Sequence, residues 1–264
     1  MNCALIGYGK MGKLLETTAG ARGHRISAIV DPYSPDSVSA TGLPILRDLQ
    51  TALKNDAGLN GADVAIEFTR PDTAAANVTA LLQTKIPTVV GTTGWYDKLP
   101  ALEKLAGETG AALLWASNFS IGVNLFYRIA AYAAKLADPL TEYDVGGYEV
   151  HHNKKADSPS GTAKTLVARV LAEMSRKKKP VWEMLDRPPA ADELHYPSLR
   201  VGAAPGVHTL IFDSSADTIE ITHTARNREG LVLGALRAAE WLVSGPGHQG
   251  VFTMDDVLAD LFKA

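Results

Sequence analysis

The chain contains 264 residues, of which 46% are hydrophobic and 21% are charged. These proportions are those of an ordinary globular protein and exclude a disordered, collagen-like or low-complexity chain. The length suggests two domains, at about 150 residues per domain. The 26 lysines and arginines nearly balance the 29 aspartates and glutamates, giving a formal net charge of −3. This balance argues against nucleic acid or an acidic membrane as the main partner, so we expect a small-molecule ligand.

Cysteine usage and hydropathy indicate the compartment. The single cysteine, Cys3, cannot form an intrachain disulfide or a thiolate zinc site, as is typical of a reducing compartment. The first predicted strand begins within a few residues of Met1 without a basic leader, and no stretch reaches the roughly 18 apolar residues of a membrane span. We expect a cytoplasmic protein that is not embedded in a membrane.

The first half of the chain alternates short apolar runs with helix-length segments. The predicted strands are bounded by Gly, Pro or Asp: Cys3–Ile6, Arg25–Val30, Val64–Phe68, Thr88–Val90 and Ala112–Trp115. The predicted helices between them are Met11–Ala21, Pro71–Thr84 and Pro100–Glu108. Repeated strand–helix alternation implies right-handed crossovers and a parallel sheet. The expected fold class is therefore α/β, with a Rossmann-like, doubly wound parallel sheet.

The pattern changes in the second half. The elements predicted there are a helix at Val123–Leu136, a strand at Val145–His151, a helix at Gly161–Ser175, strands at Val207–Phe212 and Thr218–Thr224, a helix at Leu231–Leu242 and a short helix after Thr253. One helix followed by successive strands indicates an α+β unit. We expect a dinucleotide-binding domain over 1–121, completed by 235–264, and a second α+β domain over 122–234.

A glycine-rich turn, Gly7-Tyr8-Gly9-Lys10-Met11-Gly12, follows the first strand and opens the first helix. In such a G-x-G-x-x-G turn the first glycine permits the tight turn, the second lets a pyrophosphate approach, and the third lets helix and strand pack closely. The overlapping pattern of a nucleoside-triphosphate loop lacks its Ser or Thr, because Leu14 stands there. The turn predicts a dinucleotide site; a glycine-rich turn without a ligand is the alternative.

Asp31 ends the second predicted strand, where a carboxylate can accept hydrogen bonds from the adenosine ribose. The same charge would repel the 2′-phosphate of NADP, and the next residue is Pro32 rather than an arginine. We expect NADH to be preferred and NADPH to be usable, since Lys10 or Lys13 could soften the preference.

Two further segments follow predicted strands, where open α/β sheets bind ligands. They are Gly91-Thr92-Thr93-Gly94 and Ala116-Ser117-Asn118-Phe119. Their small residues and hydroxyls suit contact with the nicotinamide ribose and amide. Ordinary turn chemistry explains the same residues.

The densest chemistry lies in the segment Glu149–Ala163, which runs from a strand end through a cationic loop into a helix. Asp157 or Ser158 is a candidate N-cap, with Pro159 inside the first turn. The N–H groups of Gly161 and Thr162 would then be available to bind an anion. This arrangement indicates a carboxylate or phosphate receptor, with a solvated basic loop as the alternative.

The two histidines of this segment do not indicate a metal site. His151 and His152 are adjacent on an extended segment and point to opposite faces, which makes them a poor pair of ligands. We expect no metal.

The run from His151 to Ala163 resembles the signature of the dihydrodipicolinate reductase family, also called 4-hydroxy-tetrahydrodipicolinate reductase. The resemblance extends to segments along nearly the whole chain: Gly7–Gly12, Glu67–Thr69, Gly91–Gly94, Asn118–Asn124, Pro205–His208 and Gly234–Arg237. It implies a Rossmann-like domain completed by the C-terminal segment and a substrate domain whose open mixed sheet assembles a homotetramer. It also implies a reaction of lysine and diaminopimelate biosynthesis. NAD(P)H reduces a cyclic unsaturated imine dicarboxylate, the dehydrated form of 4-hydroxy-tetrahydrodipicolinate, to tetrahydrodipicolinate.

Roles for individual residues follow from the same resemblance. His151 is implied as the proton donor and Lys155 as the second catalytic residue. The substrate is implied at His152, Ser160, Gly161 and Thr162. The cofactor is implied at Gly7, Tyr8, Gly9, Lys10, Met11, Gly12, Asp31, Phe68, Gly91, Thr92, Thr93, Ala116, Ser117, Asn118 and Phe119.

The chemistry of a conjugated imine fits a histidine acid. Hydride addition leaves enamine character that must be protonated by a group whose pKa lies near the working pH. At the ordinary histidine pKa near 6.5, about a quarter of an imidazole is protonated at pH 7. Two other functions remain open: another NAD-dependent amino-acid dehydrogenase on this scaffold, and a catalytically silent NAD(P)-sensing protein.

Overall fold

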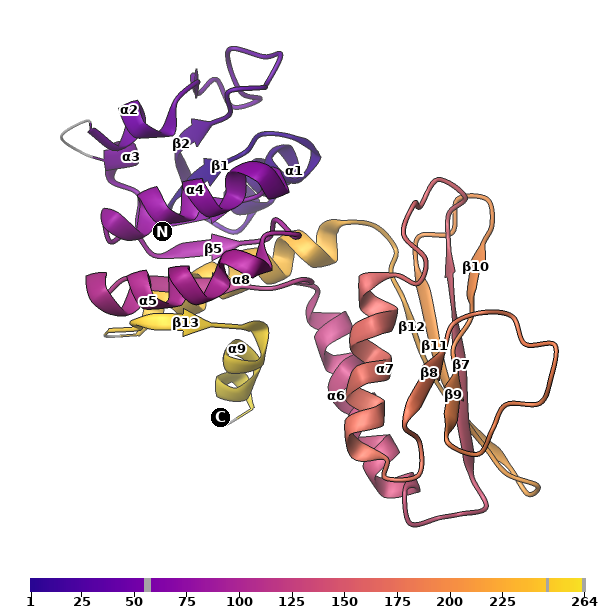
Figure 1. The fold of residues 1–264 in the computed structure, drawn as a ribbon. Helices are drawn as coiled ribbons and strands as arrows, with labels where there is room; N and C mark the ends of the chain where they lie inside the picture. The colour runs from indigo at the N-terminus through magenta and orange to yellow at the C-terminus, as the bar shows by residue number, and fades with distance from the viewer. Residues whose placement is uncertain (55–57, 246, 263–264) are drawn as a thin grey trace. The chain divides into compact units, whose positions relative to one another are not determined.

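The chain folds into two compact units, Met1–Ser120 with Glu229–Ala264, and Ile121–Arg228 (Figure 1). The computed structural model describes residues 1–54, 58–245 and 247–262. The expected return to the first unit at residue 235 falls inside helix α8 (Glu229–Ser244). Because a helix is one continuous rod, the change of unit lies at its start rather than within it.

The first unit is built on a seven-stranded sheet of order β13-β6-β5-β4-β1-β2-β3. Every neighbouring pair is parallel, and the order 3-2-1-4-5-6 is that of a doubly wound sheet. The strands are β1 (Asn2–Ile6), β2 (Arg25–Val30), β3 (Ile45–Leu46), β4 (Val64–Glu67), β5 (Thr88–Val90), β6 (Ala112–Trp115) and β13 (Gly250–Phe252). The α/β, Rossmann-like fold is confirmed.

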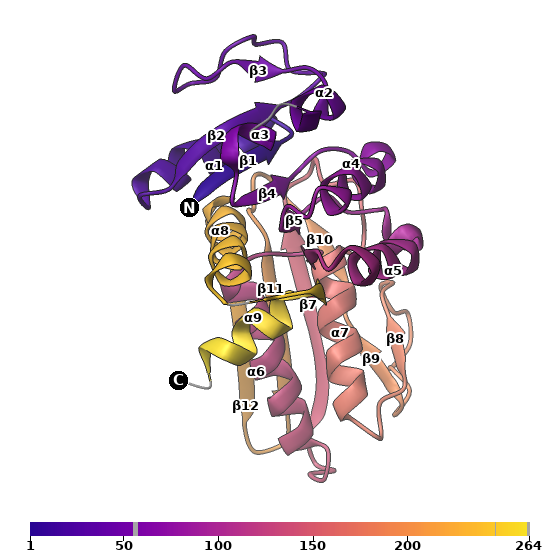
Figure 2. The same ribbon diagram turned by 90° about the vertical axis from the view of Figure 1, so that its left-hand side faces the viewer.

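Helices cover both faces of this sheet. Figure 2 shows α1 (Lys10–Ala21) and α8 on one face and α4 (Pro71–Gln83) and α5 (Leu99–Thr109) on the other. Strands buried on both faces read as apolar runs, which is why their positions are predictable. The shorter elements of this unit are α2 (Leu49–Lys54), α3 (Gly58–Gly61), the 3-10 turn η1 (Tyr96–Lys98) and α9 (Met254–Leu261).

The second unit has a four-stranded mixed sheet of order β10-β7-β11-β12. β10 pairs with β7 in parallel, and the other pairs are antiparallel. The strands are β7 (Asp144–His151), β10 (Ser198–Arg200), β11 (Val207–Asp213) and β12 (Thr218–Thr224), and a parallel pair is formed by β8 (Lys179–Val181) and β9 (Glu193–His195). Helices α6 (Ile121–Ala137) and α7 (Gly161–Glu173) pack together against one face.

The face of β7 that meets these helices changes character along the strand. Val145 packs in the apolar core with Leu166 and Phe212. Because side chains alternate across a strand, Glu149 and His151 lie on the same face as Val145. At this end the core is replaced by a polar cluster.

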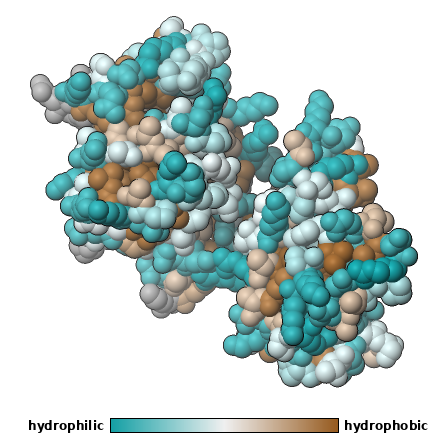
Figure 3. All heavy atoms as spheres, in the orientation of Figure 1, coloured by the Kyte–Doolittle hydropathy of each residue, from teal (hydrophilic) through white to brown (hydrophobic). Residues whose placement is uncertain are grey.

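The face drawn in Figure 3 is mainly polar. Figure 3 shows mainly hydrophilic side chains on the visible face, with hydrophobic ones in small groups. Among the described residues, no helix combines the length and hydropathy needed to cross a membrane.

Candidate functional site

The three glycines of the turn have different surroundings. Gly7 has φ +97°, and a Cβ there would lie 2.1 Å from the carbonyl oxygen of Phe68. A Cβ at Gly12 would lie 2.3 Å from the carbonyl oxygen of Gly7. At Gly9, by contrast, no described atom lies within 4 Å of that position. The first and third glycines are therefore required by turn and packing, and the second leaves an open approach to the backbone.

The start of α1 is suited to an anion. Gly9 is its N-cap residue and has no side chain with which to satisfy the first N–H groups. Such N–H groups, with the helix dipole, form a phosphate site. Lys10, the first helical residue, is exposed and Met11 is half-buried. These features fit the pyrophosphate of a dinucleotide.

Asp31 is fixed beside this turn. Its carboxylate accepts the N–H of Tyr8 at 2.7 Å and that of Tyr33 at 2.8 Å. The N–H of Tyr8 is therefore already used within the protein. The Tyr8 ring is buried, and its hydroxyl donates to Glu16 and accepts the N–H of Ala40. Tyr8 thus supports the turn from inside.

A cavity of about 450 Å³ opens beside the turn. Four of the predicted cofactor residues line it, namely Gly7, Gly9, Asp31 and Phe68. Sequence reasoning missed three further lining residues, Tyr33, Arg47 and Arg70. The Arg70 guanidinium lies 5.3 Å from the Tyr33 ring centroid, and Arg47 donates to the carbonyl oxygens of Asp31, Ser34 and Asp36. The pocket is therefore lined by two arginines as well as by Asp31, whose carboxylate is predicted to bind the adenosine ribose.

The other predicted cofactor segments follow β5 and β6 and do not line this cavity. A Cβ at Gly91 would lie 2.1 Å from the Phe68 ring, which packs 6.1 Å from the ring of Phe119. Thr92 is buried, and its hydroxyl accepts the N–H of Thr69 at 2.7 Å. Ala116 is also buried, Asn118 is half-buried, and Thr93 and Ser117 are exposed. The residues at this edge of the sheet are therefore mostly packed inside the protein, and the hydroxyls of Thr93 and Ser117 are exposed.

In the second unit, Glu149 is the centre of the polar cluster. Its side chain is fully buried. Oε1 accepts three hydrogen bonds, from the Ser160 N–H at 3.0 Å, the Ser198 hydroxyl at 2.6 Å and Arg200 Nη2 at 3.1 Å. Oε2 accepts the Ser160 hydroxyl. Burial alone would raise the pKa of Glu149, but these hydrogen bonds hold it below its ordinary value, so the carboxylate is ionised.

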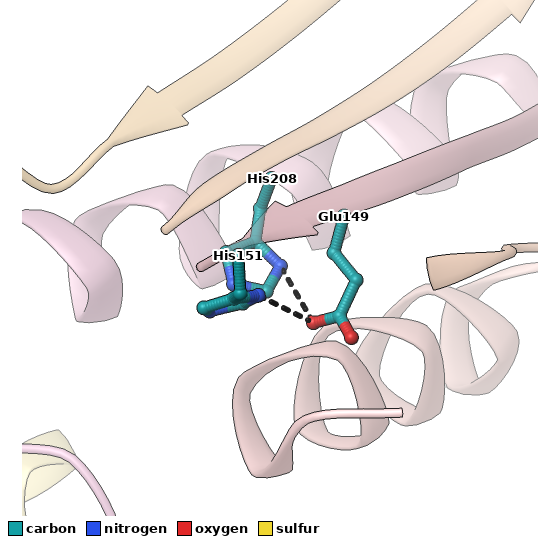
Figure 4. Close-up of side chains that lie close together, drawn as sticks. All are labelled: Glu149, His151 and His208. Atoms are coloured by element: carbon teal, nitrogen blue, oxygen red, sulfur yellow. Dashed lines mark ion pairs between the residues drawn. The ribbon is translucent and has the colours of Figure 1, made fainter. Parts of the chain in front are cut away.

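Two imidazoles face the other side of this carboxylate (Figure 4). His151 Nδ1 lies 3.4 Å from Glu149 Oε2 and His208 Nδ1 lies 3.9 Å from it. Burial lowers the pKa of both histidines; Glu149 opposes the shift, and for His208 the result is about 4. Less than the quarter expected from an ordinary histidine pKa is therefore protonated at pH 7 in the unliganded protein, and His151 is mostly neutral.

Glu149, His151 and His208 place donor atoms within 4.8 Å of one another, a spacing that a metal ion could use. The surroundings oppose it. The Arg200 guanidinium already bonds the carboxylate, and the Lys155 charge disfavours protonation of both imidazoles. A divalent cation would meet the same repulsion.

Helix α7 begins at Gly161, as predicted, but with a different N-cap residue. Its N-cap is Ser160, whose hydroxyl accepts the N–H of Ala163 at 3.1 Å; the predicted caps Asp157 and Ser158 are wrong, and Pro159 precedes the helix. The reason is tertiary, because Glu149 holds both polar groups of Ser160. Gly161 and Thr162 are the first two helical residues, so the N–H groups predicted to bind an anion belong to the first turn of this helix.

The loop between β7 and α7 carries the predicted lysine. Lys155 Nζ bonds Asp157 at 2.7 Å, with the lysine side chain 22% and the aspartate 58% exposed. The neighbouring His152 is half-buried, and its Nδ1 has no partner among the described residues. An arriving anion therefore competes with Asp157 for Lys155.

Three partners in this cluster escaped sequence reasoning, namely Ser198, Arg200 and His208. His208 lies opposite Glu149 in the β11–β7 register, and Arg200 lies opposite His151 in the β10–β7 register. The strands β7 and β11 were both predicted, but a single sequence does not show which residues of the two strands lie opposite each other. The three-residue strand β10 is too short to show alternation.

Comparison with known proteins gives a consistent result. The N-terminal part of the dihydrodipicolinate reductase family matches residues 1–119, and its C-terminal part matches residues 122–258. A 4-hydroxy-tetrahydrodipicolinate reductase of Christiangramia forsetii is 39% identical over 263 residues, covering 100% of both chains. One from Archaeoglobus fulgidus is 34% identical, covering 95% of this chain and 96% of its own.

Solved structures agree on the fold. A dipicolinate-bound dihydrodipicolinate reductase from Paenisporosarcina sp. TG-14 superposes with a TM-score of 0.78 at 23% identity, covering 96% of this chain and 97% of its own. An amine dehydrogenase from Mycobacterium smegmatis gives a TM-score of 0.63 at 10% identity, covering 95% and 94%.

Proposed function

The chain belongs to the dihydrodipicolinate reductase family, and we infer that it is an NAD(P)H-dependent reductase of the dehydrated form of 4-hydroxy-tetrahydrodipicolinate. The product is tetrahydrodipicolinate, an intermediate of lysine and diaminopimelate biosynthesis. The observation that carries this inference is the ionised Glu149 beneath His151, next to Lys155 and the first turn of α7. No observation favours a silent sensor or an amino-acid dehydrogenase.

Substrate capture is assigned to the cationic loop and the helix start. The substrate carries two carboxylates, and one of them replaces Asp157 as the partner of Lys155. The N–H groups of Gly161 and Thr162, in the first turn of α7, bind a carboxylate with help from the helix dipole. Each hydrogen bond to a charged group contributes about 1.5–3 kcal/mol, enough to orient the ring. The hydroxyl of Ser160 bonds Glu149 and caps α7, so its role is to fix this turn.

Proton delivery is assigned to His151. When bound, NAD(P)H supplies the hydride that adds to the conjugated imine, and the enamine left behind takes a proton from the imidazolium. Burial keeps unliganded His151 mostly neutral, whereas the two negative charges of the substrate favour its protonated form. Substrate binding thus charges the acid that the reaction uses.

The cofactor is assigned to the first unit. The first turn of α1 would hold its pyrophosphate, and Asp31, which lines the 450 Å³ cavity, would hold its adenosine ribose. We propose that NADH is preferred, because the Asp31 carboxylate opposes a 2′-phosphate, and that Arg47 and Arg70 leave NADPH usable. Steady-state kcat/KM with both cofactors tests this, and a higher value for NADPH would reject it. Asp31→Asn should narrow the difference.

The assembly we propose is a homotetramer in the cytoplasm. On the face of the mixed sheet away from α6 and α7, Tyr148 and Leu199 are 39% and 56% exposed, and a cavity of about 340 Å³ is lined by Tyr148 and Ile211. A second copy would cover these groups. Sedimentation should give four times 28.1 kDa, and Leu199→Asp should dissociate the assembly. The free, buried Cys3 suits a reducing compartment.

The assignment of His151 is tested by His151→Gln. The substrate is supplied by the preceding synthase, and loss of nicotinamide absorbance is followed. We expect kcat to fall at least about 100-fold, the usual share of a general acid, with KM changed little. Wild-type kcat in this variant would refute the assignment of the acid, and no activity in the wild type would refute the function.

A further inference from the structure

We propose that Glu149 is a positioning residue of this reaction: it holds His151 with a proton on Nδ1, so that Nε2 carries the proton that is transferred. The proposal rests on the proposed function of His151. Glu149 touches neither substrate nor cofactor in this account and acts only through the imidazole.

The hydrogen bonds of Glu149 determine which oxygen faces the imidazole. Oε1 accepts three donors, from the Ser160 N–H, Ser198 and Arg200. Oε2 accepts one, from the Ser160 hydroxyl, and lies 3.4 Å from His151 Nδ1. An ionised carboxylate only accepts hydrogen bonds. The nitrogen of His151 that faces it is therefore the one that carries a hydrogen in the neutral ring.

The geometry around His151 places the two ring nitrogens in different surroundings. Nδ1 is buried and makes no hydrogen bond in the described part of the chain, although Glu149 Oε2 lies 3.4 Å away, so a small approach toward Oε2 completes the bond. Nε2 faces Gly206, where an added Cβ would lie only 3.1 Å away. Because Gly206 has no side chain, no Cβ at this position blocks access to Nε2.

The second imidazole lies farther from this charge and stays neutral. His208 stands opposite Glu149 on β11 and is 0.5 Å farther from Oε2 than His151 is, at 3.9 Å against 3.4 Å. It is buried deeply enough to stay neutral, and its Nδ1 lies 3.4 Å from the Tyr196 hydroxyl. The Glu149 carboxylate therefore lies nearer to His151 Nδ1 than to His208 Nδ1.

The charged and titratable groups that face His151 come from three strands and one loop. They are Glu149 on β7, Arg200 on β10, His208 on β11, and Lys155 and Asp157 in the loop. The cations disfavour the imidazolium, and Asp157 is largely exposed. Glu149 is thus the buried anion that makes an imidazolium accessible at this position.

The decisive variant is Glu149→Gln. Three donors on Oε1 require that the amide oxygen stay at that place, so the amide nitrogen takes the place of Oε2 and becomes a donor toward His151 Nδ1. We expect the neutral ring to switch to the form protonated on Nε2. We also expect kcat at pH 7 to fall about tenfold or more and the pH at which kcat declines to move lower, because one opposite charge within 4–6 Å is lost.

The tautomer is read from ¹⁵N-labelled histidine by NMR in the unliganded protein, which has seven histidines; the spectrum of His151→Gln identifies the signal. This readout does not need catalysis, so it decides the proposal even if His151 is not the acid. Glu220→Gln, an exposed change on β12, should leave tautomer and kcat unchanged. Ser198→Ala removes one Oε1 donor and should cost stability without switching the tautomer.

An unchanged His151 tautomer in a folded Glu149→Gln variant would overturn the proposal, as would an unchanged pH profile. If Glu149→Gln does not fold, Glu149→Asp replaces it. The shorter carboxylate keeps the charge, and we expect it to retain the Nδ1–H tautomer with kcat between wild type and the histidine variant. An Nε2–H tautomer in the wild type would also refute the positioning role.

Discussion

Alanine substitution is expected to have opposite effects on stability at two glycines of α1, Gly12 and Gly20. Gly20 is exposed, and no described atom lies within 4 Å of the place where its Cβ would be. Gly20→Ala should therefore gain up to about 1 kcal/mol of helix propensity. At Gly12 the added Cβ would lie 2.3 Å from the Gly7 carbonyl oxygen, whereas ordinary contacts span 3.4–4 Å. The helix must then move about 1 Å away from β1.

The sizes of the packing cost and the propensity gain decide whether Gly12→Ala stabilises or destabilises the protein. Overpacking of this kind costs about 1–3 kcal/mol, which exceeds the propensity gain at Gly12 by up to about 2 kcal/mol. At about 2–4 °C per kcal/mol for a chain of this size, Gly12→Ala lowers Tm by up to about 8 °C and Gly20→Ala raises it by up to about 4 °C. In the proposed cofactor site, the displaced N–H groups would also lose contact with the pyrophosphate. One lost hydrogen bond to a charged group, about 1.5–3 kcal/mol, raises the KM for NADH at least about tenfold.

Calorimetry and initial rates at varied NADH check both parts. Gly20→Ala is the matched control, since it makes the same change in the same helix and should leave KM unchanged. A Gly12→Ala protein as stable as Gly20→Ala, with the wild-type KM for NADH, would refute the close-packing argument.

Three further changes test the second unit. Lys155→Ala should lower kcat and raise the KM for substrate. Initial rates that give wild-type values of both would refute the assignment of Lys155 to the site. Asp157→Asn frees Lys155 from its partner, and since an exposed ion pair contributes about 0.2–1 kcal/mol, the KM for substrate should fall about 1.4- to 5-fold; an increase would contradict the competition. Burial holds the pKa of His208 near 4, below its value of about 6.5 in the unfolded chain, so the unfolded state binds more protons and stability falls as the pH drops from 6.5 toward 4. Urea unfolding should show a shallower fall for His208→Gln than for the wild type, and identical slopes would contradict this.

Several elements could be located from the sequence because their signals are local. The strands at Arg25–Val30, Thr88–Val90 and Ala112–Trp115 have the predicted bounds, since each is a mainly apolar run followed within two residues by Gly or a polar residue. The family and the reaction were predicted from the run His151–Ala163, in which each residue type has a fixed spacing along the chain. The strands β3 and β13 were missed because β3 has two residues, too few to show periodicity, and β13 begins with a glycine and contains only two apolar residues, Val251 and Phe252.

The sequence by itself determined the parallel-sheet domain and the glycine-rich turn, since turn geometry and strand burial depend on neighbouring residues. It also determined the family and the reaction, through the run His151–Ala163. The tertiary structure decided the rest. Ser198 and Arg200 reach Glu149 across 49 and 51 residues of chain, so two of the hydrogen bonds that keep Glu149 ionised follow from strand register. The N-cap of α7 follows from the contact of Ser160 with Glu149, and the neutral state of His151 follows from burial. Charge and pKa depend on burial and on neighbours in space, and residues distant in the chain supply both.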